Sequence, residues 1–217
     1  MVRRTPISNL RGSKSFRRTL GQKPPRSITL IVCEGETEQE YFEAARIHYG
    51  LTTAEIILAD NTKGPAPISV VEFAEEKCGE RGGYDQIYCV FDRDGHESFD
   101  RARVQIRSLS GRKRKPLPID EAISIPCFEL WILLHFERTD APFHRCTNVI
   151  DRVRHHRQGY VKANAAIVKQ LMAKVETALG NAEWLEARAE NNDYNPYTSV
   201  DQVLRHFEAV AGQGKTP

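Results

Sequence analysis

Short apolar runs alternate with longer amphipathic stretches over the first half of the chain. Residues 28–33 read Ile-Thr-Leu-Ile-Val-Cys, an almost unbroken apolar run that is typical of a strand covered on both faces. Strands are also predicted at 55–59, 86–91 and 119–125, and helices at 37–49, 68–78 and 94–109. Strands that alternate with helices predict an α/β fold, in which helices flank a mostly parallel central sheet.

The residues that follow Pro126 have a mainly helical pattern. Helices are predicted there at residues 128–136, 163–179, 182–189 and 199–211, with a loop at 191–196 and a tail at 212–217. Two of the earlier helices are expected to begin at capping boxes, one formed by Thr37 with Glu40 and the other by Asp94 with Glu97. We therefore divide the chain into a basic arm (1–26), an α/β core (27–137) and a helical extension packed on the core (138–217).

Charge is unevenly distributed, although the formal net charge is only +2. Residues 1–26 contain Arg and Lys but no Asp or Glu, which predicts a flexible arm that is either solvated or in contact with phosphates. The arm lacks the apolar stretch of a secretory signal, and no apolar run approaches the ~20 residues of a membrane helix. We expect a cytoplasmic protein with no membrane partner.

Cysteine usage agrees with that expectation. The five cysteines are scattered and form no Cys-x-x-Cys pair. This pattern predicts reduced thiols and gives no indication of a zinc site.

Acidic residues follow two of the predicted strands. Glu34 comes directly after the first strand, and Asp92 and Asp94 follow the third. In open α/β sheets, ligand sites lie beyond the carboxyl ends of the strands, so these acids can meet if the two strands are neighbours. Mg²⁺, or Mn²⁺ in its place, is the natural counter-charge for such a cluster and can polarise a phosphodiester. Alternatively, Asp94 caps a helix and Asp92 is an ordinary strand-end residue.

Several motifs occur in a characteristic order along the chain. They are Ile-Val-Cys-Glu-Gly-Glu-Thr-Glu at 31–38, Val-Phe-Asp-Arg-Asp-Gly-His at 90–96, Ser-Ile-Pro-Cys-Phe-Glu-Leu-Trp at 124–131, Tyr-Val-Lys at 160–162 and Asn-Pro-Tyr-Thr at 195–198. This series resembles the RloB family, which is regarded as Toprim-related. One departure is Cys127, which stands where a polar residue such as Asn is expected.

The resemblance implies a Toprim-like fold with Glu34 as general acid or base and Asp92 and Asp94 as metal ligands. RloB-like proteins are typically associated with bacterial restriction and phage-defence loci, often beside an ATPase gene. The resemblance therefore also implies a nucleic-acid substrate and an ATPase partner.

Other residues have two interpretations each. Glu129 is either a fourth carboxylate for a second metal or an acid that the helix dipole stabilises in the first turn of a helix. Glu38 has the same two interpretations, and the helix dipole is the preferred one. Lys162 is either a solvated side chain or the cation that neutralises a transition-state phosphate. His135 is either a catalytic acid or a buried core histidine. Basic clusters at 112–115 and 152–157 are either surface charge or phosphate contacts.

The leading hypothesis is a Mg²⁺-dependent nuclease that cuts DNA or a structured RNA such as tRNA. A phosphatase of the haloacid-dehalogenase type is the second hypothesis, because Asp-Arg-Asp-Gly at 92–95 resembles its signature. The third is a non-catalytic effector or sensor subunit that binds nucleic acid or the ATPase. Any of these can form a homo-oligomer.

Overall fold

A computed structural model describes residues 27–60, 66–189 and 195–213. The predicted basic arm, the tip of the loop after the second strand, most of the loop at 191–196 and the end of the tail lie outside these residues. The described part contains a five-stranded sheet of order β2-β1-β3-β4-β5, in which the first four strands are parallel and β5 runs antiparallel to β4. The strands are β1 (Thr29–Cys33), β2 (Ala54–Leu58), β3 (Gln86–Asp92), β4 (Ile119–Ile125) and β5 (Tyr197–Thr198). The predicted α/β fold with a mostly parallel sheet is confirmed.

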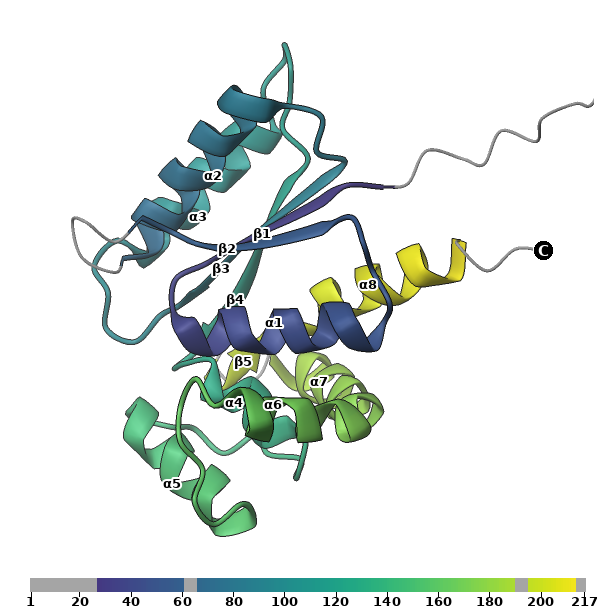
Figure 1. The fold of residues 1–217 in the computed structure, drawn as a ribbon. Coiled ribbons are helices and arrows are strands. Elements are labelled where there is room, and N and C mark those ends of the chain that lie inside the picture. Colours follow the sequence, from purple (N-terminus) through teal and green to yellow (C-terminus); the bar gives the residue numbers. More distant parts are fainter. Residues whose placement is uncertain (1–26, 61–65, 190–194, 214–217) are drawn as a thin grey trace, which may run out of the picture.

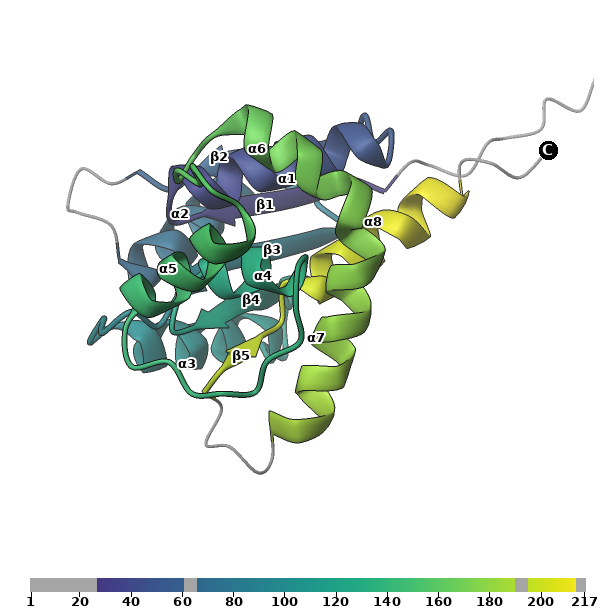
Figure 2. The same ribbon diagram turned by 90° about the horizontal axis from the view of Figure 1, so that it is seen from below.

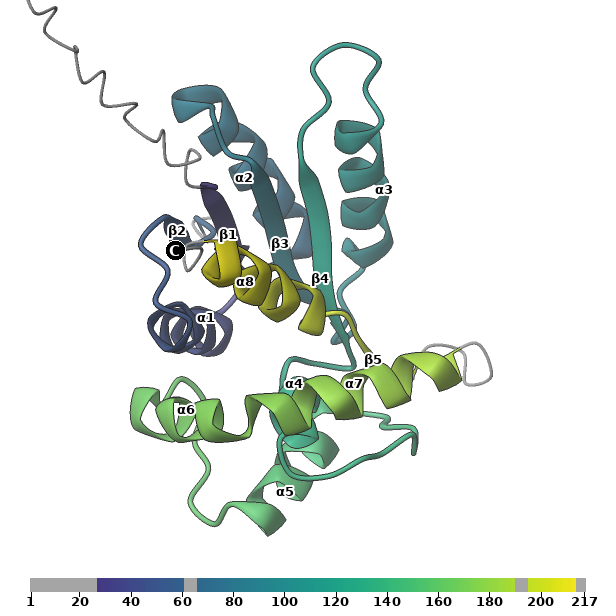
Figure 3. The same ribbon diagram turned by 90° about the vertical axis from the view of Figure 1, so that its right-hand side faces the viewer.

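Helices cover both faces of the sheet (Figures 1 and 3). On one face α2 (Pro67–Arg81) and α3 (Phe99–Ser110) pack against alternate strand residues such as Leu30, Val32 and Phe91. On the other face α1 (Glu36–His48) and α8 (Asp201–Gln213) pack against the intervening residues. Successive side chains of a strand point to opposite faces, so a continuous apolar run is what a strand between two helical layers requires.

The remaining helices form a further layer beyond α1, seen in the foreground of Figure 2. They are α4 (Glu129–Leu134), α5 (Cys146–His156), α6 (Ala165–Leu171), the short 3₁₀-helix η2 (Met172–Lys174) and α7 (Val175–Ala189). The chain then returns to the sheet, where β5 completes its edge and α8 covers its face. Strand β5 and helix α8 fall within the predicted helical extension, but β5 belongs to the central sheet and α8 packs directly on it. Over the described residues, no helix is both long enough and apolar enough to cross a membrane.

Both predicted capping boxes are wrong. Helix α1 begins at Glu36 after Gly35, and the Thr37 hydroxyl accepts a hydrogen bond from the distant Ala163 N–H (3.2 Å). Helix α3 begins only at Phe99, because Gly95 has a φ of +75° and turns the chain between β3 and the helix. Helix α5 and strand β5 were not predicted, and the predicted break near residue 180 is absent because α7 continues through it.

The packing of α8 predicts how strongly it contributes to stability. Phe207 is fully buried and meets the ring of Phe42 edge to face. We expect Phe207→Ala to lower the free energy of unfolding by about 3–5 kcal/mol, because the cavity cannot collapse between a helix and a sheet. Urea denaturation followed by circular dichroism measures this. Ile47→Ala on the exposed side of α1 is the control and should change stability by less than ~0.5 kcal/mol; an equally small effect at Phe207 would contradict the packing.

Candidate active site

The first two predicted acids lie side by side at the carboxyl ends of β1 and β3. These strands are neighbours with Cys33 opposite Val90, and Glu34 N–H continues the pairing to the Val90 carbonyl (3.0 Å). The backbone N–H of Asp92 donates to Glu34 Oε2 (3.2 Å). The predicted adjacency of the two strand ends is therefore confirmed.

The carboxylate of Asp92 points toward the start of α4. Its Oδ2 accepts a hydrogen bond from Phe128 N–H (2.9 Å), while its Oδ1 is buried and has no hydrogen-bond partner among the described residues. Burial raises the pKa of Asp92 well above its usual value, and the charge of Glu38 raises it further. A buried carboxylate oxygen without a partner is costly, which makes this atom a candidate contact for a cation or a water molecule.

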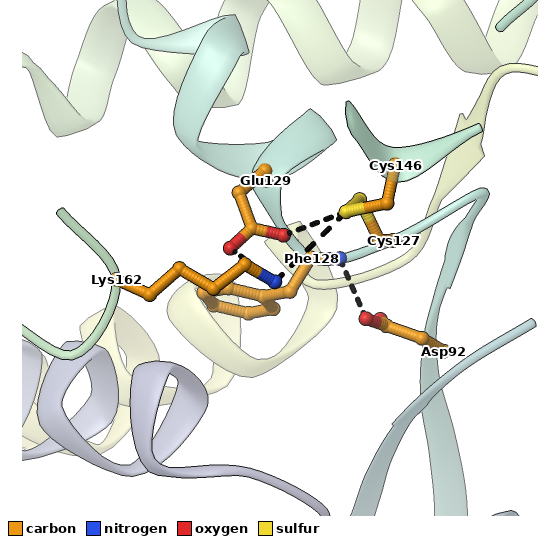
Figure 4. Close-up of a disulfide and its surroundings, with 6 residues drawn as sticks. All are labelled: Asp92, Cys127, Phe128, Glu129, Cys146 and Lys162. Atoms are coloured by element: carbon orange, nitrogen blue, oxygen red, sulfur yellow. Dashed lines mark hydrogen bonds and ion pairs between the residues drawn. A yellow bond between two sulfur atoms is a disulfide. The ribbon is translucent and has the colours of Figure 1, made fainter. Parts of the chain in front are cut away.

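Two further acids face the same place, from the first turns of α1 and α4. Glu38 is only 6% exposed, and burial together with the charges of Glu129 and Glu34 raises its pKa to about 7. Glu129 is 1% exposed, and its Oε1 lies 2.9 Å from Lys162 Nζ (Figure 4). Although burial acts to lower the pKa of Lys162, the adjacent Glu129 raises it, so the ammonium stays charged.

At the rim of the cluster, Glu34 meets the loop that follows β3. Burial raises the pKa of Glu34. The hydrogen bond from Asp92 N–H acts to lower this pKa, and so does the nearby His96. His96 Nε2 lies 3.5 Å from Glu34 Oε1. Asp94 is exposed, and its charge also raises the pKa of Glu34. Asp94 is therefore close to the cluster, although its side chain faces solvent.

The acids share one neighbourhood without forming a closed ligand shell. Among the described residues, the only three donor atoms found within 4.8 Å of one another come from Cys127, Glu129 and Cys146. Glu34, Asp92 and Asp94 are spaced more widely than this. The two cysteines of that group form a disulfide and offer no thiolate to a metal.

The family model described as RloB-like protein matches residues 29–207. This chain belongs to the RloB-like family. No curated protein and no solved structure matches it.

The structure gives the RloB-like chain two site residues that the sequence did not assign. Glu38 was interpreted as a helix-dipole acid, but it is buried among Glu34, Asp92 and Glu129. Tyr160 has a buried hydroxyl without a hydrogen-bond partner among the described residues, and burial followed by the charge of Glu129 raises its pKa. Glu38 follows Glu34 by only four residues, and this closeness along the chain was the available signal.

The location of His135 corrects its predicted catalytic role. It is 1% exposed, and its two ring nitrogens lie 3.0 Å from the Trp131 carbonyl and 3.0 Å from the Tyr41 hydroxyl. Burial lowers the pKa of His135 to about 4, which keeps the ring neutral near pH 7. It is a core histidine of the RloB-like fold.

The prediction of reduced cysteines is also wrong. Cys127 and Cys146 form a disulfide, while Cys33, Cys78 and Cys89 are free thiols. The start of α4 and the start of α5 pack together, which brings the two Cα atoms to 5.6 Å although 19 residues separate them. Spacing along the chain could not indicate this pair.

Burial of Glu38 predicts a pH-dependent stability. Its carboxyl titrates near pH 4.5 in the unfolded chain and near 7 in the folded protein. Between these values the unfolded chain has lost the proton and the folded protein keeps it, so the free energy of unfolding falls as pH rises and stays low above 7. We expect Glu38→Gln to reduce this fall, stabilising the protein at pH 8 by up to about 3 kcal/mol while changing little at pH 4.

Chemical denaturation of the metal-free protein at several pH values measures this effect. Glu36→Gln, at an exposed position in the same helical turn, is the matched control and should keep the wild-type pH profile. An unchanged profile in Glu38→Gln would contradict the placement of Glu38 among buried acids.

Proposed function

We propose that this RloB-like protein is a metal-dependent nuclease whose acidic cluster holds Mg²⁺ or Mn²⁺. The observation that carries the proposal is the buried, unpartnered Oδ1 of Asp92, which faces Glu38 and Glu129 at the carboxyl end of a parallel sheet. Carboxylate oxygens are the ligands that hard divalent cations prefer, and several acids in one buried place need a counter-charge.

The residues divide into roles by their position. Asp92 holds the cation, with Glu34 and Asp94 beside it and Glu129 and Glu38 on the opposite side. When bound, the cation supplies charge stabilisation for a phosphodiester and lowers the pKa of a water molecule. Glu34, whose pKa is raised by burial, is suited to exchange a proton with the nucleophile or leaving group. Lys162 extends a half-exposed ammonium beside Glu129, where it can contact the scissile phosphate.

Nucleic acid is proposed as the substrate because of the family and the distribution of basic residues. The last turn of α5 is basic. The loop after α3 presents four more exposed cations, Arg112 to Lys115, at the opposite end of the sheet from the acidic cluster, because this loop precedes β4 (Figure 3). Such residues give sequence-independent contacts with phosphates. The role in anti-phage defence and the control by an ATPase partner rest on the family resemblance and are part of the same proposal.

Cleavage assays on plasmid DNA and total RNA test this function, with and without any ATPase that is encoded beside the gene. We expect Mg²⁺-dependent cleavage that EDTA abolishes. Asp92→Asn should weaken cation binding, and Glu34→Gln should slow cleavage ~100-fold or more, as expected for loss of an acid–base group. Glu72→Gln, an exposed acid of α2 on the other side of the sheet, is the control and should retain full activity.

Other results would identify the alternatives. Release of inorganic phosphate from small phosphoesters without cleavage of nucleic acid would indicate a phosphatase. Cation or nucleic-acid binding without turnover, alone and with the ATPase, would indicate an effector or sensor subunit.

A further inference from the structure

The disulfide lies directly against the acidic cluster (Figure 4). Cys127 immediately precedes Phe128, whose N–H binds Asp92, and it lies two residues before Glu129. Cys146 is the first residue of α5. The bond therefore joins the segment that carries two contacts of the cluster to a separate helix.

The sulfur of Cys146 also touches the ion pair of the cluster. Its Sγ lies 3.2 Å from Glu129 Oε2 and 3.9 Å from Lys162 Nζ. A sulfur in a disulfide has no proton and no charge, whereas a thiol can donate a hydrogen bond and a thiolate can pair with an ammonium. The redox state of Cys146 thus determines whether a new partner competes for Glu129 and Lys162.

We infer that the Cys127–Cys146 disulfide is a reversible switch that positions Glu129, and through the Phe128 N–H also Asp92, for cation binding, and that its reduction weakens the site. The inference rests on the proposed cation site. In an otherwise reducing compartment, such a bond is typically a redox sensor rather than a permanent staple.

The chemical step is a thiol–disulfide exchange. An external dithiol supplies two electrons and two protons; the S–S bond breaks, two S–H bonds form on Cys127 and Cys146, and the dithiol becomes a disulfide. An oxidising disulfide such as oxidised glutathione reverses the exchange. Reduction frees the Cys127–Glu129 segment from α5 and presents Glu129 with a thiol. Support of this kind around metal ligands is commonly worth about 10–100-fold in metal affinity, so we expect reduction to weaken binding about tenfold.

Titration of the full chain with Mn²⁺ alone, followed by electron paramagnetic resonance of the free ion, tests the switch without depending on catalysis. The protein is prepared oxidised and reduced, the reagents are removed, and peptide mapping with alkylation verifies the linkage. We expect the oxidised form to bind Mn²⁺ about tenfold more tightly. The variant that combines Cys127→Ser with Cys146→Ser should bind like the reduced form under both conditions, with circular dichroism as the check on folding.

Cys78→Ser is the matched control, because Cys78 is a free, half-buried cysteine of α2 on the other face of the sheet. It should keep the full redox effect. Equal Mn²⁺ affinity of the two wild-type forms, or a map of the oxidised protein without the Cys127–Cys146 peptide, would overturn the switch and leave the cation site intact. Absence of Mn²⁺ binding in both forms would instead overturn the cation site together with the switch. If the double variant does not fold, the Mn²⁺ affinities of the oxidised and reduced wild-type protein still test the switch.

Discussion

Mutual repulsion among buried carboxylates is the constraint on which the rest of this structure depends. Glu34, Glu38, Asp92 and Glu129 come from four separate elements and meet beyond the ends of β1 and β3. Burial and like charge both disfavour their ionised forms, which is why the pKa values of the first three are raised. Lys162 offsets part of this charge. The divalent cation that we propose for this site would reduce this repulsion on binding.

The apolar packing around α4 keeps the acids together in spite of that repulsion. Every residue of α4 is buried, and the rings of Tyr41, Phe128 and Trp131 meet edge to face between α1 and α4. Edge-to-face aromatic pairs add to the stabilisation that comes from burial of the rings themselves. His135 belongs to this cluster of rings, which explains why its nitrogens are directed to the core. The rigidity of the site therefore comes from the hydrophobic contacts between two helices.

The sheet supplies the complementary half of the site. Parallel pairing of β1 with β3 fixes Glu34 and Asp92 at one level, and the backbone N–H of each strand end is used in the pairing or by the other acid. The disulfide ties α5 to the turn between β4 and α4, at the point where the helical layer touches the acids. Cys127 is joined to Glu129 through Phe128, and the Phe128 N–H donates a hydrogen bond to Asp92. A change in the disulfide can therefore reach both acids without a rearrangement of the sheet.

The local sequence determined those strands and helices whose formation depends mainly on residues close to one another in the chain. The apolar runs of β1 and β3 require helices on both faces. This requirement, together with the alternation of strands and helices, predicted the sheet and the meeting of Glu34 with Asp92. Features that depend on distant residues were beyond such reasoning. Thr37 binds Ala163 instead of capping its helix, and β5 exists only because β4 offers it an edge. Glu38 is buried beside acids from other elements, and Cys127 meets Cys146 only because the starts of α4 and α5 pack together. The tertiary structure decided these because burial and pairing are set by the free energy of contacts across the whole chain, which no single segment contains.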